Sequence, residues 1–286
     1  MEKKLVDIII YSILSVGIMA GVNLIIYFLY PEFFKAITPL LMFIPLVSVL
    51  VTNALISKRP LSSYGVAKGK ISVKYIILAL VFPLAIIMLA VPFALILGFK
   101  VDFTFSKFYS YVRDLAELSG IPYETLLTLF MINALIAPFI NTVFAFGEEA
   151  GWRGFLLTRL EEEFDRNIAI IISGLIWGLW HWPLILLIGY DYTYETRFWG
   201  ALIFLLYAIV LGSLLSWLRF KTESVIMPSL AHGSFNAYTG FGVFLIDAEP
   251  ILGFPVGILS LLGLLLLLGI IFYLDIRSGS NSLILE

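Results

Sequence analysis

Three charged residues stand together where an apolar stretch of the chain ends. Glu148, Glu149 and Arg153 occur in the segment Glu-Glu-Ala-Gly-Trp-Arg. A carboxylate at such a position can take a proton from water and later return it to a leaving group. Glu149 and Arg153 are four residues apart, so on a helix that continues through Gly151 they share a face and can pair. These residues suit acid–base chemistry, although charged residues also commonly mark the end of a membrane span.

The two histidines of the chain both lie inside apolar stretches. His181 stands in Trp177-Gly-Leu-Trp-His-Trp-Pro, and His232 lies four residues before Asn236. His181 can orient a water molecule, and His232 with Asn236 can donate hydrogen bonds to an oxyanion. A structural interpretation is also open for each. His181 can bond a carbonyl freed by Pro183, and the His232–Asn236 pair can join helices through hydrogen bonds.

Taken together, these groups suffice to hydrolyse a peptide bond with water as the nucleophile. We expect Glu148 to act as the base, because partial burial of a carboxylate favours such a role. A serine nucleophile is less convincing. Ser234 faces away from His232, and Ser229 follows Pro228 at the start of the helix, where a serine commonly begins a helix. The predicted catalytic set is Glu148, His181, His232 and Asn236.

Composition identifies the surroundings of these residues as a membrane. Of 286 residues, 61% are hydrophobic and 13% are charged, and the mean hydropathy is +1.03. Spanning helices need about 20 apolar residues each. Eight stretches qualify, with cores at 5–29, 36–56, 75–98, 124–147, 168–189, 199–218, 225–247 and 256–274. The sequence therefore predicts an all-α, polytopic bundle of about eight transmembrane helices. We expect one integral membrane domain over 1–286, with the motifs in a core of about 124–247.

The positions of Lys and Arg predict the orientation of the bundle. Cytoplasmic loops of membrane proteins retain an excess of these residues. With the N-terminus inside, the outer loops hold Lys35, Lys100, Lys107, Arg113 and Arg197, and the other thirteen of the eighteen lie on the inner side. We therefore expect both termini in the cytoplasm and the site towards the cytoplasmic side.

Two segments between spans have an interfacial pattern. Apolar residues at near-helical spacing over 103–118 predict an amphipathic helix at the outer interface, although an ordinary connector fits about as well. The aromatic residues of 190–199 are typical of an interfacial belt: Tyr190, Tyr192, Tyr194, Phe198 and Trp199. A formal net charge of −2 without clustered basic residues argues against a nucleic-acid partner. Cysteine is absent, which excludes a cysteine nucleophile and thiolate metal ligands.

The ordered motifs resemble those of the CPBP family of intramembrane proteases, which includes the type II CAAX prenyl endopeptidases and bacteriocin-processing or self-immunity proteins. The family pattern is Glu-Glu-x-x-x-Arg, then Phe-x-x-x-His, then His-x-x-x-Asn or Asp, on successive membrane helices. Glu148, Glu149 and Arg153 match the first motif, His181 the second, and His232 with Asn236 the third. Trp177 stands where the family has Phe, which affects the expected substrate fit more than the chemistry.

The resemblance implies roles for these residues. Glu148 and His181 would activate water, and His232 with Asn236 would form the oxyanion site. Glu149, Arg153 and Trp177 would shape the site or hold the substrate. The family has been described both as metal-dependent and as glutamate-dependent. We favour a mechanism without a cofactor, with zinc on Glu148, His181 and His232 as the alternative.

The same resemblance implies the substrate and the partners. We expect cleavage near the C-terminus of a prenylated CaaX-type or other membrane-associated peptide, within the lipid bilayer. Two alternatives belong to other classes of protein. One is a non-catalytic immunity or scaffold protein whose polar cluster fixes helix packing. The other, less favoured, is a proton-coupled transporter, although the sequence has no clear repeated halves or paired broken helices.

Overall fold

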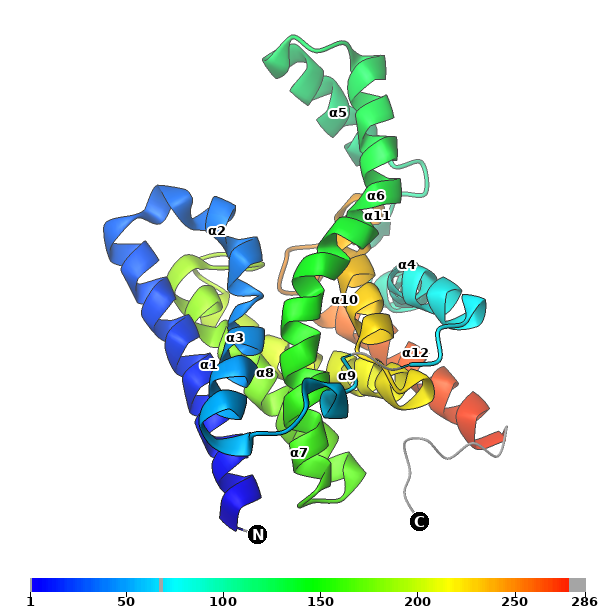
Figure 1. Ribbon diagram of the computed structural model, residues 1–286. Helices are drawn as coiled ribbons and strands as arrows, with labels where there is room; N and C mark the ends of the chain where they lie inside the picture. Colours follow the sequence, from blue (N-terminus) through cyan, green and yellow to red (C-terminus); the bar gives the residue numbers. More distant parts are fainter. Residues whose placement is uncertain (1, 67–68, 278–286) are drawn as a thin grey trace.

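Long helices account for most of the computed structural model, which describes residues 2–66 and 69–277 (Figure 1). The α-helices are α1 (Glu2–Leu29), α2 (Phe34–Leu41), α3 (Ile44–Thr52), α4 (Val73–Ile96), α5 (Ser106–Ser119), α6 (Tyr123–Glu149), α7 (Leu157–Glu161), α8 (Arg166–Ile188), α9 (Arg197–Thr222), α10 (Ile226–Tyr238), α11 (Gly242–Leu245) and α12 (Ile258–Arg277). The shorter elements are η1 (Pro31–Phe33), η2 (Asn53–Ser57), η3 (Leu61–Tyr64), η4 (Ala150–Leu156), η5 (Thr239–Phe241), β1 (Lys100–Val101) and β2 (Ile246–Asp247). The all-α fold class predicted from the sequence is confirmed.

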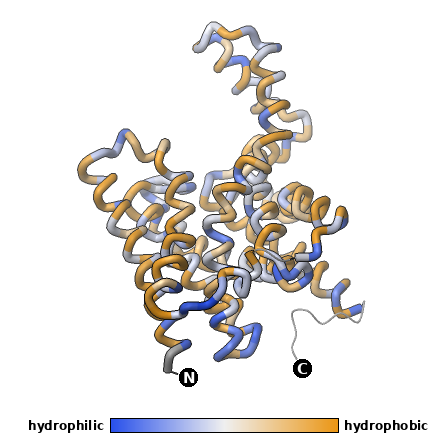
Figure 2. Tube along the Cα trace, in the orientation of Figure 1, coloured by the Kyte–Doolittle hydropathy of each residue, from blue (hydrophilic) through white to orange (hydrophobic). Residues whose placement is uncertain are grey.

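Seven helical segments of the described residues are long and apolar enough to span a membrane. They are Lys4–Leu29, Ala36–Ser57, Val73–Ile96, Tyr123–Glu161, Arg166–Ile188, Arg197–Thr222 and Ile258–Arg277. Hydrophobic residues run along these helices, and hydrophilic residues gather in the loops near the N-terminus (Figure 2). Large apolar side chains such as Ile13, Leu135 and Val143 are exposed on the helix surfaces, as expected where the surrounding medium is lipid.

One of the eight predicted spans, 225–247, is not one spanning helix. Its helical part, α10, has 13 residues and is therefore about 20 Å long, too short for a hydrocarbon core of about 30 Å. Beyond Tyr238 the chain continues through the short η5 and α11 into β2. Most side chains of α10 are buried by neighbouring helices, so protein rather than lipid accounts for its apolar character. The apolar stretch was long enough for a membrane span, but the helices that surround it could not be predicted from the sequence.

The short α10 still carries the chain from one end of the bundle to the other. At its start, Val225 N donates to Gly65 O (3.2 Å), in the loop before α4. Beyond its end, β2 pairs antiparallel with β1, which follows α4, with Lys100 opposite Asp247. Helices α4 and α10 therefore run in the same direction, and the assignment of the loops to the two sides of a membrane stays a prediction. Lys68, one of the thirteen inner basic residues, lies outside the described residues.

Ion pairs join the loops at the end of the bundle where the chain begins. Glu162, after α7, pairs with Arg59 (2.5 Å) and with Lys4 (3.7 Å). Lys70 pairs with Glu223 in the loop between α9 and α10 (2.7 Å). We call this end, with Glu2 and Arg277, the terminal end, and the end with β1 and β2 the strand end (Figure 1).

The predicted amphipathic segment 103–118 is helical, as α5. It forms a hairpin with the start of α6 that projects beyond the rest of the strand end (Figure 1). Phe108 packs edge-on against Phe130 of α6 and Phe244 of α11, with ring centroids 5.7 and 5.4 Å apart. The position of α5 at a membrane interface stays a prediction.

The predicted aromatic belt of 190–199 is only partly a surface feature. Tyr194, Phe198 and Trp199 are exposed, as a belt requires. Tyr192 is buried and its hydroxyl donates to the carbonyl of Val256 (2.9 Å). Tyr190 lines the internal cavity described below. The prediction is wrong for these two tyrosines, because the chain folds back at Gly189 and turns them inward.

Candidate active site

The Glu-Glu-Ala-Gly-Trp-Arg segment lies inside one continuous helical rod, at the junction of α6 and the π-helical turn η4. Single π-turns within α-helices are frequent at functional sites. Gly151 allows α1 and α3 to pack against this turn, since a Cβ there would lie 2.4 Å from the Tyr11 hydroxyl and 2.5 Å from Pro45 Cβ. The motif is therefore in the interior of the bundle and does not mark the exit from a membrane.

Glu149 joins the first motif to the third. Its Oε1 accepts from Arg153 Nη1 (2.9 Å), one helical turn away, and from His232 Nδ1 on α10 (2.8 Å). All three side chains are buried. The predicted pairing of Glu149 with Arg153 is present, and the bond to His232 was not foreseen. Buried charges need such partners, because an isolated ion in a low-dielectric interior costs several kcal/mol.

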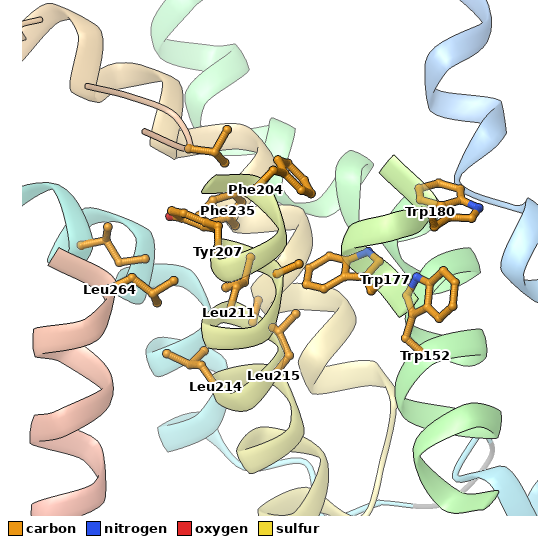
Figure 3. Packing of buried hydrophobic residues seen from close by; sticks show 14 of the residues in the cluster. Trp152, Trp177, Trp180, Phe204, Tyr207, Leu211, Leu214, Leu215, Phe235 and Leu264 are labelled. Carbon is orange, nitrogen blue, oxygen red and sulfur yellow. The ribbon is translucent and has the colours of Figure 1, made fainter. Parts of the chain in front are cut away.

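Glu148 is held by two tryptophans. Its Oε2 accepts from the indole nitrogen of Trp177 on α8 (2.7 Å) and from that of Trp152 on η4 (3.3 Å). Trp152 and Trp177 lie beside Trp180 in the packed interior (Figure 3). Hydrogen bonds from neutral donors stabilise the carboxylate form without supplying a competing charge. Only 2% of Glu148 is exposed, yet it lines the cavity.

The position at which the family has Phe thus has a polar role in this chain. Trp177 donates to Glu148, which a phenylalanine cannot do. The Arg153 guanidinium also lies over the Trp177 ring, 4.3 Å from the ring centroid, in a cation–π contact. From the sequence we predicted a role in substrate fit for Trp177 and missed Trp152 altogether. The four-residue spacing of Trp152 from Glu148 was the available signal.

The backbone fixes which nitrogen of His181 carries the proton. His181 Nδ1 lies 3.0 Å from the carbonyl oxygen of Trp177, which can only accept. Nδ1 therefore carries hydrogen, and in the neutral ring Nε2 has a free lone pair. The ring packs against Phe204, with centroids 4.4 Å apart, and against Trp180 at 4.8 Å. The Nε2 lone pair of this packed ring can accept a proton from water or orient the water molecule.

These groups line a cavity of about 700 Å³. Its walls include Glu148, Trp177, His181, His232 and Asn236, so the three motifs meet at one internal surface. Asn236 is exposed, unlike His232 one turn before it on α10, and its amide can reach a bound molecule. The volume is within the range of about 300–1,000 Å³ typical of ligand pockets.

The serines near His232 have local partners. Ser229 Oγ donates to the carbonyl of Val225 and Ser234 Oγ to that of Leu230, both at 2.7 Å. Both residues are buried, and neither is among those that line the cavity. These bonds agree with the interpretation of Ser229 as a residue of the first helical turn.

The zinc alternative requires Glu148, His181 and His232 to converge on one point. In the part of the chain that the structure describes, no three His, Asp or Glu side chains lie close enough together to hold a metal ion. In both histidines Nδ1 has a protein partner, so Nε2 is the nitrogen left to bind a metal. The donor set does not fit a three-ligand site in this conformation, and we derive no step through a metal.

The cavity extends from the catalytic groups towards the strand end. Its lining there comes from Thr38 of α2, Tyr111 of α5, Tyr190 and Asp191 after α8, and Phe244 of α11. His181 lies 15 residues into α8, about 22 Å from the start of that helix at the terminal end. The side of the membrane on which the cavity lies stays a prediction, as does the orientation of the termini.

Comparison with known proteins identifies the segment that carries the site. Residues 123–238 match the family model described as type II CAAX prenyl endopeptidase Rce1-like. "CAAX prenyl protease 2" of Methanococcus maripaludis is 30% identical over 154 residues, covering 52% of this chain and 48% of the relative. The chain thus matches about half the length of that relative. The matched segment runs from α6 to the end of α10 and contains all the site residues. For this segment, the family predicted from the motifs is confirmed.

Proposed function

We propose that this protein is an intramembrane endopeptidase that hydrolyses a peptide bond of a membrane-associated substrate. The observation that carries the proposal is the convergence of Glu148, His181, His232 and Asn236 on one cavity inside a bundle of membrane-spanning helices. Ionisable groups in membrane helices are expensive and mark functional sites by default. The name of the matched relative, a CAAX prenyl protease, supports the same class of reaction.

Water is the nucleophile in the proposed mechanism. Glu148 accepts a proton from water through a carboxylate oxygen, while His181 Nε2 orients the water through its free lone pair. The hydroxide equivalent attacks the carbonyl carbon, and the tetrahedral intermediate collapses when the proton held by Glu148 passes to the leaving amine. The products are a new carboxylate and a new amine. The indoles of Trp177 and Trp152 keep the carboxylate of Glu148 in place.

His232 and Asn236 stabilise the oxyanion. His232 already uses Nδ1–H towards Glu149, so it can donate from Nε2 only when the ring carries both protons. Glu149 stabilises that imidazolium, as a buried carboxylate does for an orienting histidine elsewhere. Arg153 in turn balances the charge of Glu149. Asn236 supplies a second, neutral donor. Removing one such donor from other enzymes costs about 10²–10³ in kcat.

The substrate proposed for this site is a prenylated CaaX-type peptide or another membrane-associated peptide. Aromatic and aliphatic side chains make up most of the cavity wall, including Phe204, Phe235 and Leu184. Such a wall suits apolar side chains or a lipid chain next to the reacting bond. The cavity also lies among helices that contact lipid, from which a membrane-bound peptide can enter.

Cleavage of a fluorogenic farnesylated CaaX peptide in liposomes tests the proposal. Wild type should cleave, and Glu148→Gln and His232→Ala should lose at least 10²-fold in kcat. Glu124→Gln, an exposed carboxylate on the same helix α6, is the matched control and should be fully active. Cleavage by Glu148→Gln at the wild-type rate would reject the proposed base and favour a non-catalytic polar cluster. Loss on chelation with rescue by zinc would support the metal alternative.

The orientation in the membrane stays a prediction and bears on the substrate. Because the chain has no cysteine, single cysteines can be introduced without background. Ser63 at the terminal end and Ser119 at the tip of α5 are both exposed. Labelling of Ser119→Cys but not Ser63→Cys by an impermeant thiol reagent on intact cells would place the cavity mouth outside, which favours a translocated peptide. The opposite pattern places it in the cytoplasm, which suits a prenylated protein.

A further inference from the structure

The cavity has a second carboxylate that the proposed mechanism does not use. Among the described residues that line it, the carboxylates are Glu148 and Asp191, and none is lysine or arginine. Arg153 is paired with Glu149 and stacked on Trp177, and it is not among the residues that line the cavity. Carboxylate groups therefore face the cavity at two separate places.

A rigid turn holds Asp191 against the cavity. Gly189, with φ +78°, ends α8, and its amide donates to Ile185 O (2.9 Å). Asp191 itself has φ +60°, a left-handed conformation that Asp and Asn tolerate better than other residues with side chains. Tyr192 N then closes the turn on Gly189 O (2.9 Å), and the buried Tyr192 packs over Gly200. The backbone at Asp191 is thus fixed by its neighbours on both sides.

Asp191 lacks a partner for its charge. No hydrogen bond or ion pair from the residues that the structure describes reaches its carboxylate. The titratable neighbours that face it are Tyr190, Tyr192 and Tyr207, which supply no positive charge. Burial raises the pKa of Asp191 to about 7. An unpaired carboxylate in such a place is costly, and a cation from a bound ligand relieves that cost.

The distance from His181 to the turn that carries Asp191 sets how many residues of a bound peptide separate the two. Gly189 is eight residues beyond His181 on α8, about 12 Å along the helix axis. An extended peptide covers that length in about three or four residues. The ring of Tyr190, the residue before Asp191, lies 6.5 Å from the His181 ring by centroids. One substrate can therefore touch both the reacting groups and Asp191.

We propose that Asp191 is a specificity subsite that binds a cationic group of the peptide, a lysine or arginine side chain, three or four residues from the bond that is cleaved. The inference rests on the proposed function and adds a charge requirement to it. The aromatic wall would bind the apolar part of the substrate, and Asp191 would select its register.

Paired peptides test the subsite. The same membrane-anchored peptide carries either lysine or glutamine at one position, scanned over five residues on each side of the cleaved bond. Wild type should prefer lysine at one position by about tenfold in kcat/KM, through KM, in the range expected for a partly buried charge pair. Asp191→Asn, which tolerates the same backbone conformation, should lose this preference. Glu195→Gln, an exposed carboxylate in the same loop, should keep it.

Binding gives a second measurement that does not depend on cleavage. The Kd of each lysine and glutamine peptide is measured for Glu148→Gln and for Glu148→Gln with Asp191→Asn. A Kd that is tenfold tighter for one lysine peptide than for its glutamine pair in the first protein, with no such difference in the second, supports the subsite. This holds even if no peptide is cleaved, because the absence of cleavage counts against the proposed function and not against the subsite. An equal Kd for all pairs in the first protein, or an equal loss of kcat for both peptides in Asp191→Asn, overturns the inference.

Discussion

The indole nitrogen of Trp177 lies 2.7 Å from Oε2 of Glu148, so the aromatic residue of the second motif donates to the proposed base of the first. Trp177→Phe retains an aromatic ring and removes the donor. A hydrogen bond to a charged group contributes about 1.5–3 kcal/mol. We therefore expect kcat to fall by at least tenfold with little change in KM, measured by steady-state cleavage in liposomes.

Trp180→Phe is the matched control for this change. Trp180 is as buried as Trp177, and its indole nitrogen has no hydrogen-bond partner in the described structure. Its replacement removes similar volume without removing a bond to Glu148. Similar losses of kcat in the two variants would mean that ring size, and not the donor, decides activity.

A second prediction concerns the chain of Arg153, Glu149 and His232. Glu149→Gln removes the ion-pair partner of the buried Arg153 guanidinium, a kind of change that costs about 3–5 kcal/mol in other proteins. Arg153→Met leaves Glu149 bonded to His232, so its cost should be smaller. Thermal unfolding in detergent should give the order of stability wild type, Arg153→Met, Glu149→Gln. The reverse order for the two variants would contradict the view that Glu149 is the centre of this network.

Four-residue spacing on helices accounted for the part of the site that the sequence could predict. It placed Glu149 beside Arg153, and His232 near Asn236, because such residues share a helix face. The apolar stretches gave seven of the long helices, since chain length and hydrophobicity are local properties. The prediction for 225–247 was wrong because α10 is apolar for burial against other helices, and hydropathy does not distinguish protein from lipid.

The remaining contacts depend on the packing of distant segments. His232 and Glu149 are 83 residues apart, and Trp177 and Glu148 are 29 apart. No local spacing rule predicts which of several buried donors meets which carboxylate. Asp191 was not predicted to reach the cavity, because the turn at Gly189 that brings it there is not visible as a hydrophobic pattern.

A third prediction concerns the contact between α6 and α10. A Cβ on Gly233 would lie 2.5 Å from Thr142 N and 2.8 Å from Pro138 O, both backbone atoms of α6. Gly233→Ala must therefore push the helices apart and displace the neighbouring His232. Overpacking of this kind costs about 1–3 kcal/mol. We expect a lower unfolding temperature and reduced kcat.

Gly21→Ala serves as its control. Gly21 lies within α1, and a Cβ there would meet no atom within 4 Å. Alanine favours a helix over glycine by up to about 1 kcal/mol, so this variant should be at least as stable as wild type and equally active. A Gly233→Ala protein that matches Gly21→Ala in both measurements would show that the helices do not pack this closely.

The last prediction follows from the titration of Asp191 and needs no substrate. Its pKa is raised by burial from the usual 3.8 to about 7 in the folded protein. The folded state therefore disfavours the charged form. The resulting loss of stability is absent well below pH 4, grows as the pH rises towards 7, and is complete above 7. Asp191→Asn removes the ionisable group and with it this loss. Relative to wild type, the variant should gain on the order of 1–2 kcal/mol between pH 5 and pH 8. Thermal unfolding of both proteins across this range measures the difference, with Glu195→Gln as the control in the same loop. A difference that does not change with pH would mean that Asp191 is already paired or fully hydrated in the folded protein, and would remove the unpaired carboxylate on which the proposed cation subsite depends.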